Sequence, residues 1–295
     1  MPELPEVETI ARGLAMRVAG DVIESVWLGS KPQTFKSKPG EIAATLEHKK
    51  IAEVRRAGKH IVFDLEANHA GPIRRTSAGR RPARPGRRPG PTREVADSNA
   101  QWIVHLGMTG RVVVCEPAAE VAKHTHAILR LASGRELRFV DPRRFGRLSV
   151  THGFQAPGSE PLEVELDRFV QLFRGRKTPI KSALLNQKLL SGVGNIYADE
   201  SLFRAGVRPR RRAASLTRED LRRLYGAVQE VLKEAIALGG SSISDYVDAD
   251  GDEGFFQLQH RVYGREDEPC LVCKTAIKRL VIAGRSSHYC PKCQK

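Results

Sequence analysis

The sequence predicts a multidomain α+β protein, with an N-terminal helix and a β-rich domain, a helical domain, and a small C-terminal zinc-binding hairpin. Three observations lead to this fold class. Short β-rich runs dominate the first half, helical periodicity dominates the middle, and four cysteines cluster near the end. A chain of 295 residues suits about two domains and such a module. We therefore expect domains at 1–150, 151–260 and 261–295.

The first 20 residues are expected to form a helix. Pro2 and Pro5 fall in or before its first turn, where a missing N–H costs little. Apolar residues then recur at helical spacing until Gly20, which marks the end of the helix.

Six runs rich in β-branched and aromatic residues predict strands. They span residues 22–28, 60–66, 101–107, 111–116, 126–131 and 136–140. Turn signals such as Ser133-Gly134 separate them. Many short strands with such spacing are typical of an all-β sandwich or barrel.

One basic stretch, Gly71–Asn99, interrupts this pattern. It holds eight Arg against one Glu and one Asp, with five Pro and four Gly. Such a segment cannot bury a core, so we expect a disordered loop between two strands. Its arginines either add non-specific affinity for a polyanion or have no role.

Helical patterns follow Gly158. The runs are 165–175, 179–192, 195–206 and 216–240, and the last opens with a capping-box pair, Thr217 and Asp220. Residues 241–265 are rich in Gly, Asp and Ser and are expected to form a mobile loop.

Charge and composition limit the classes of function that this chain can have. The net charge is +15, and it stays strongly positive without the basic stretch, which favours a nucleic-acid partner. No apolar run approaches the roughly 18 residues of a membrane span, and the N-terminus lacks a signal-peptide core. We expect no membrane partner. Five cysteines are too few and too clustered for a secreted disulfide scaffold.

The C-terminal cysteines form two CxxC pairs, Cys270/Cys273 and Cys290/Cys293, with sixteen residues between them. This spacing suits one tetrahedral zinc ion held by four thiolates. A closed four-cysteine site has no open position, so the ion is structural. The alternative is a redox dithiol, which lacks a thioredoxin-like βαβ context here.

The N-terminus offers a second chemical signal. Removal of Met1 before the small Pro2 would leave a secondary amine, which is partly neutral near pH 7 and nucleophilic. Glu3 and Glu6 lie one turn apart beside it, where they suit general acid–base catalysis. The alternative is that both carboxylates only complement the helix dipole.

Several motifs together carry a resemblance to a known family. They are MPELPEVE at the start, HLGMTG at 105–110, DPRRFG at 141–146, GVGNIYADESLF at 192–203, VYGR at 262–265 and the cysteine module. In this order they resemble the bacterial formamidopyrimidine-DNA glycosylases, within the Fpg/Nei family. The resemblance covers nearly the whole chain except roughly residues 70–100.

The resemblance implies a β-sandwich domain, a helix–two-turn–helix DNA-binding domain and a zinc hairpin around a DNA cleft. It implies a bifunctional base-excision-repair enzyme: a glycosylase for 8-oxoguanine and formamidopyrimidines, and an abasic-site lyase acting by β,δ-elimination. The catalytic residues it implies are Pro2 as nucleophile, Glu3 as proton donor, Lys59 in β-elimination and Arg285 in δ-elimination, with Glu6 in support. Because a guanidinium is a poor acid, we expect Arg285 to hold phosphate.

The resemblance also implies the DNA contacts. They are His124, Arg143, Arg176, Lys181 and Asn195, while Met108, Arg143 and Phe145 fill the space left by a flipped nucleotide. From spacing alone, His124 and His126 could instead form a metal pair, although no third ligand is evident.

Two other functions remain open on the sequence. One is an endonuclease VIII-like glycosylase for oxidised pyrimidines, whose N-terminus typically reads PEGPE where this chain has PELPE. The other is a non-catalytic zinc-containing DNA-binding protein, which only Pro2, Glu3 and Lys59 oppose. The expected partner is double-stranded damaged DNA, bound by a monomer in the cytoplasm at the nucleoid.

Overall fold

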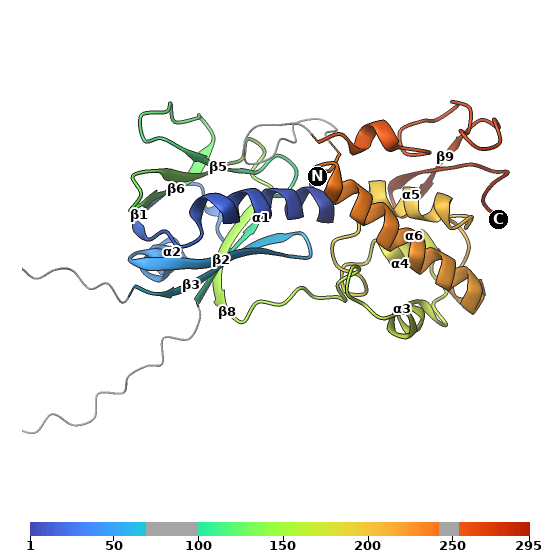
Figure 1. Cartoon of the computed structure of the whole chain (residues 1–295), viewed down its shortest axis with the longest axis horizontal. Helices are drawn as coiled ribbons and strands as arrows, with labels where there is room; N and C mark the ends of the chain where they lie inside the picture. The colour runs from blue at the N-terminus through green and yellow to red at the C-terminus, as the bar shows by residue number, and fades with distance from the viewer. Residues whose placement is uncertain (69–99, 242–253) are drawn as a thin grey trace, which may run out of the picture.

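The computed structural model describes residues 1–68, 100–241 and 254–295, which form a β-rich half, a helical half and a C-terminal hairpin (Figure 1). The conformation expected for the 71–99 stretch lies outside these residues, as do residues 242–253 of the loop expected over 241–265. The described remainder of that loop contains an ordered 3₁₀ turn at Phe256–Gln259. Within the described ranges, no helix is long and apolar enough to cross a membrane.

Helix α1 (Leu4–Val18) is shorter at both ends than the 20 residues expected. Its apolar stripe, which includes Val7, Ile10 and Leu14, is buried in the core of the β-rich half. The helix lies against strand β2 and also touches α6 (Arg218–Ala237), so it joins the two halves (Figure 1). The N-terminus consequently lies at their junction.

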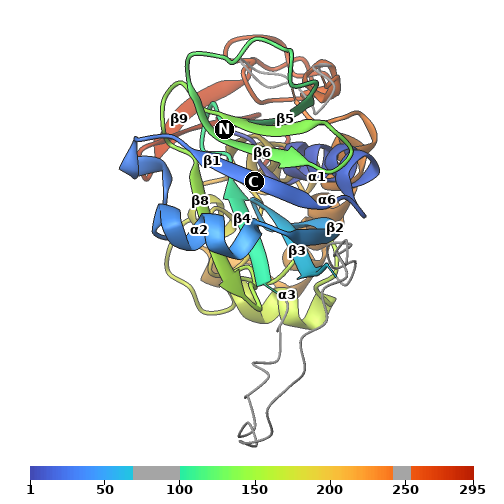
Figure 2. The same ribbon diagram turned by 90° about the vertical axis from the view of Figure 1, so that its left-hand side faces the viewer.

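The β-rich half is a sandwich of two four-stranded antiparallel sheets (Figure 2), so the barrel alternative is wrong. One sheet has the order β1-β6-β7-β5, from Ile23–Leu28, Thr125–Leu131, Glu136–Val140 and Arg111–Cys115. The other has the order β2-β3-β4-β8, from Lys49–Ala57, His60–Ala67, Ala100–His105 and Arg147–His152. Large side chains such as Phe63, Trp102 and Phe139 fill the core.

Neighbouring strands β3 and β4 flank the basic stretch. They pair in antiparallel register from His60↔His105 to Leu65↔Ala100, so the stretch joins two adjacent strands, as the sequence predicts.

Two strands and one helix of this half were not predicted from the sequence: β2, β8 and the short helix α2 (Pro39–Leu46). Strand β2 carries five charged residues in nine, which hide its alternation. Its buried positions, Ile51 and Val54, pack against the core beneath α1.

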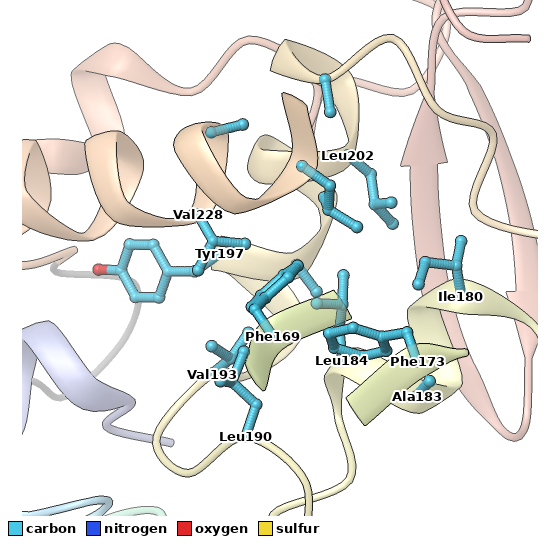
Figure 3. Packing of buried hydrophobic residues seen from close by; sticks show 14 of the residues in the cluster. Phe169, Phe173, Ile180, Ala183, Leu184, Leu190, Val193, Tyr197, Leu202 and Val228 are labelled. Carbon is cyan, nitrogen blue, oxygen red and sulfur yellow. The ribbon is translucent and has the colours of Figure 1, made fainter. Parts of the chain in front are cut away.

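The helical half packs around one apolar core formed by Phe169, Phe173, Leu184, Tyr197 and Val228, among others (Figure 3). Its helices are α3 (Leu166–Phe173), α4 (Ile180–Leu184), α5 (Asn195–Arg204) and the long α6. Short 3₁₀ turns lie at Ala213–Ser215 and Phe256–Gln259, and a third, at Pro32–Thr34, lies in the β-rich half.

Two local expectations for these helices have different outcomes. The capping box of α6 is confirmed, because Asp220 N–H donates to Thr217 Oγ1 at 3.1 Å and Thr217 N–H donates to Asp220 Oδ2 at 3.0 Å. The expected helix over 179–192 is wrong beyond Leu184. There the Asn186 side chain accepts from Lys188 N–H at 3.0 Å and supports a turn instead.

The C-terminal hairpin pairs β9 (Lys278–Ile282) with β10 (Arg285–Tyr289). Strand β10 packs against α5, so the hairpin closes one side of the helical half. Its turn, between Ile282 and Arg285, contains Gly284 in a positive-φ conformation.

Candidate active site

Pro2 and Glu3 lie where the start of α1 meets the start of α5. Glu3 is buried, and its Oε1 accepts the Ile196 N–H at 3.1 Å. This N–H belongs to the first turn of α5, whose partial positive charge favours a carboxylate. Two segments more than 190 residues apart in sequence thus form one site.

Glycines in the GVGN segment make this approach possible. A Cβ at Gly194 would lie 2.1 Å from Glu3 Cδ, and one at Gly192 would lie 2.8 Å from Leu4 Cδ1. Gly192 also has φ of +94°, a conformation that favours glycine. The glycines therefore let the backbone of this turn pack directly against the first residues of the chain.

We predict that Gly194→Ala sharply reduces activity because the new methyl group displaces the Glu3 carboxylate. Gly226→Ala in α6 is the matched control, since nothing lies within 4 Å of its added Cβ and alanine is the better helix former. Single-turnover base excision and thermal unfolding of both variants test this. A Gly194→Ala protein with wild-type excision would contradict the placement of Glu3.

The environment of Glu3 favours its protonated form. Burial is the main cause and raises the pKa of Glu3, and the nearby Glu6 raises it further. Lys59 and the backbone N–H groups of Ile196 and Tyr197 act in the opposite direction. A carboxyl group with a raised pKa keeps its proton nearer to neutral pH, as a proton donor requires.

Glu6 organises the same end of α1. It accepts the Glu3 N–H at 2.7 Å and the Ser241 N–H at 2.8 Å, and it also accepts the Tyr197 hydroxyl. Burial and the Glu6 carboxylate raise the pKa of Tyr197, so its hydroxyl stays a donor. Glu6 thus holds the backbone of Glu3 in place, and its supporting role in catalysis stays a prediction.

Lys59 follows Gly58 in the tight turn between β2 and β3. Its side chain is largely buried, and burial lowers the pKa of its ammonium group. Glu3 opposes this effect, whereas Arg285 reinforces it. A lowered pKa increases the neutral fraction of the amine, which can then accept a proton.

Arg285 begins β10, and the backbone beside it is held by two side chains of the helical half. Asn195 Nδ2 donates to the Ser286 carbonyl at 3.0 Å, and Lys181 Nζ donates to the same oxygen at 2.6 Å. Asp199 completes the anchor by pairing with Lys181 at 2.7 Å and accepting the His288 N–H at 2.9 Å.

This geometry corrects one expectation. Lys181 has no exposed side-chain surface, so a direct contact with DNA is not compatible with its position. Its charge is neutralised by Asp199 instead. Lys181 fixes the hairpin that carries Arg285, and so supports the site from within the protein.

A cavity of about 390 Å³ lies where the N-terminus, the start of α5 and the start of β10 meet. Its lining includes Pro2, Glu3, Glu6, Met108, Arg143, Asn195 and Arg285. Four further lining residues, Thr109, Ile196, Ser241 and Tyr263, were not singled out from the sequence. Thr109, Ile196 and Tyr263 belong to the quoted motifs HLGMTG, GVGNIYADESLF and VYGR, which were the available signals for them, whereas Ser241 belongs to none.

The DPRRFG turn forms the opposite wall. Buried Asp141 accepts the Thr109 hydroxyl at 2.6 Å and the Gly146 N–H at 2.7 Å, which fixes the turn. Phe145 is 48% exposed, and the Arg143 guanidinium lies 4.8 Å from its ring centroid. Met108 is 43% exposed on the neighbouring loop. Exposed apolar groups beside an arginine suit insertion into a base stack.

The other predicted DNA contacts lie outside this cavity. His124 is exposed just before β6, whereas His126 is buried and its Nε2 lies 3.0 Å from the Asp141 carbonyl oxygen. Among the described residues, no third potential metal ligand joins these two histidines, so the structure does not support the metal-pair alternative. Arg176 is exposed in the helical half, beyond the end of α3.

The four C-terminal cysteines meet in space. Their Sγ atoms all lie within 4.8 Å of one another, with Cys273–Cys290 at 3.4 Å and Cys270–Cys293 at 3.9 Å. Thiolates in this arrangement suit tetrahedral zinc, and a four-cysteine set leaves no position for substrate. The ion would fix the hairpin that carries Arg285.

We predict that Cys290→Ser abolishes stoichiometric zinc binding and reduces lesion-DNA binding, while the sandwich domain stays folded. Metal binding supplies much of the folding free energy of so small a module. Cys115→Ser is the matched control, since Cys115 lies in β5 in the other half. Zinc content and binding measured on both variants test this. A zinc-free Cys290→Ser protein that binds lesion DNA normally would contradict it.

Comparisons with known proteins cover the whole chain. Three family descriptions match: the formamidopyrimidine-DNA glycosylase N-terminal domain at residues 1–148, its H2TH domain at 157–247, and a zinc finger found in FPG and IleRS at 267–295. Curated relatives named formamidopyrimidine-DNA glycosylase include those of Solibacter usitatus, 42% identical, and Desulfitobacterium hafniense, 40% identical, each over all of both chains.

Solved structures of proteins with the same family name are also similar to this chain. The MutM (FPG) protein of Thermus thermophilus is 40% identical, with a TM-score of 0.79 over 99% of this chain and 98% of that one. A Lactococcus lactis FPG mutant, G226P, in complex with DNA containing Fapy-dG is 29% identical, with a TM-score of 0.83 over all of both chains.

Proposed function

Because the chain belongs to the formamidopyrimidine-DNA glycosylase family, we propose that it excises oxidised purines from damaged duplex DNA and then cleaves the strand. The substrates are 8-oxoguanine and formamidopyrimidines. Relatives over the full length support this choice over an oxidised-pyrimidine glycosylase or a non-catalytic protein, and Fapy-dG and carbocyclic 8-oxo-G appear in the solved complexes of its neighbours.

The observation that carries the proposal is the meeting of Pro2, Glu3 and Arg285 at one cavity with Lys59 beside them. A nucleophile, an acid, a base and a phosphate ligand are the groups that the reaction needs. The strong positive charge of the chain supplies the attraction to DNA.

We assign the first step to Pro2 and Glu3. The damaged nucleotide leaves the base stack and enters the cavity, as chemistry at C1′ requires. The freed Pro2 nitrogen attacks C1′ and the N-glycosidic bond breaks. The base leaves with the bonding electron pair and is protonated, and the Pro2 nitrogen loses its own proton. Glu3 delivers a proton to the sugar ring oxygen as the ring opens, and an iminium joins Pro2 to C1′.

The later steps use the iminium as an electron sink. Loss of a C2′ proton breaks the bond from C3′ to its phosphate, and loss of a C4′ proton then breaks the bond from C5′ to its phosphate. The neutral fraction of Lys59 accepts protons in this sequence, and Arg285 binds phosphate. Water finally releases the sugar fragment from Pro2.

We also propose that the enzyme acts as a monomer in the cytoplasm, where the chromosome lies. One chain supplies both walls of the cavity, from the DPRRFG turn and from α5 with β10. The function is tested by incubating the protein with duplexes containing 8-oxoguanine or an oxidised pyrimidine. Preferential cleavage of the second would contradict the proposal.

A further inference from the structure

A second hollow lies on the other side of the DPRRFG turn from the catalytic cavity. It has a volume of about 440 Å³ and is lined by Trp27, Lys31, Lys123, His124 and Arg144, among others. Of the described residues that line it, none carries a carboxylate. We call these five residues the outer surface. The hollow and the catalytic cavity flank the same turn, because Arg143 lines the cavity and the next residue, Arg144, lines this hollow.

The cations of the outer surface are free to bind a ligand. Lys31, Lys123 and Arg144 are exposed, and none of them takes part in an ion pair within the described ranges. Arg144 has φ of +57°, a strained conformation for a residue with a side chain. The turn thus directs Arg143 to the catalytic cavity and Arg144 to the second hollow.

Trp27 is the apolar part of this surface. It lies near the end of the edge strand β1 and is 52% exposed, although tryptophan is usually largely buried. A half-exposed indole beside lysines can pack on a deoxyribose and donate its N–H to a phosphate.

The loop between β5 and β6, which carries Lys123, is held in place by a buried arginine. Buried Arg138 donates to the carbonyls of Ala119 at 3.0 Å and Glu120 at 2.9 Å, while its charge is paired with Glu136 at 2.7 Å. A buried ion pair therefore fixes the loop between β5 and β6. Lys123 follows the anchored residues and therefore lies in an ordered segment, which reduces the entropy lost on binding.

We propose that the outer surface binds the sugar–phosphate backbone of the duplex flanking the lesion, with Lys31 and Lys123 on phosphates and Trp27 against a sugar. This inference rests on the proposed function, because it extends the same DNA path. The occupant follows from charge complementarity and from the position of this surface next to the turn that also borders the catalytic cavity.

Tryptophan fluorescence reports directly on this surface. The chain has two tryptophans, and the other, Trp102, is 1% exposed in the sandwich core. Acrylamide quenching therefore reads mainly Trp27, and Trp27→Phe gives the background. We expect a long duplex with a stable abasic analogue to protect Trp27 from acrylamide, and a short duplex that ends at the lesion to leave it accessible. Unchanged quenching in a saturated long-duplex complex would overturn the proposal.

Salt dependence gives the second readout. The double variant Lys31→Ala/Lys123→Ala should flatten the log–log slope of long-duplex affinity by about 2, since each phosphate contact contributes about 0.9. Lys233→Ala, an exposed lysine on α6 in the other half, is the charge control and should leave the slope near that of wild type. Equal slopes for the double variant and the control would also overturn the proposal. Borohydride trapping of the short duplex by the wild-type protein tests the catalytic function separately. A failure of the proposed outer surface can therefore be distinguished from a failure of the proposed catalytic function.

Discussion

Replacing Glu3 by Gln is expected to lower the single-turnover rate of 8-oxoguanine excision about a hundred- to ten-thousand-fold, the usual cost of losing a positioned acid. Glutamine has nearly the same size and its amide oxygen can still accept the Ile196 N–H, so the site should keep its shape. What is lost is a carboxyl group that can donate a proton and whose pKa is raised by burial.

The same variant should retain some strand cleavage at a preformed abasic site, because the base has already left and Pro2 can still form the iminium. Glu41→Gln is the matched control, since Glu41 is exposed on α2 and lies outside the cavity. Wild-type excision of 8-oxoguanine by Glu3→Gln would show that the proton comes from another group.

Retention of Met1, or a tag fused before Pro2, is expected to abolish both base excision and strand cleavage. The Pro2 nitrogen would then belong to a peptide bond, where its lone pair is delocalised and not nucleophilic. A cleavable tag whose removal leaves Pro2 at the N-terminus is the control and should restore both steps. A tagged protein that still cleaves abasic DNA at the wild-type rate would contradict this role of the amine.

Signals confined to one short segment were predictable from the sequence. The four cysteines, the Thr217–Asp220 capping box and the apolar runs of the sandwich each carry their own pattern, and each is found in the structure. Strand β2 was missed because charged residues on its exposed face hide the buried Ile51 and Val54.

Contacts between distant segments could not be predicted in the same way. The sequence shows Glu3 and Gly194 as separate motifs, and only the fold brings the start of α1 onto the start of α5. Lys181 shows the limit most clearly, because a lysine in a basic protein is usually a surface charge. Its burial depends on Asp199, and nothing in the spacing of the two residues on separate helices reveals their pairing.

The central claim, that the N-terminal amine attacks the sugar, is tested most directly by borohydride reduction on an abasic duplex followed by peptide mapping. Reduction converts the iminium to a stable amine, which links DNA to the attacking residue. We predict that mass spectrometry finds Met1 absent and the DNA adduct on Pro2 in the N-terminal peptide. An adduct on Lys59, whose pKa is lowered by burial, or on any internal lysine, would contradict the account even though the family assignment would stand.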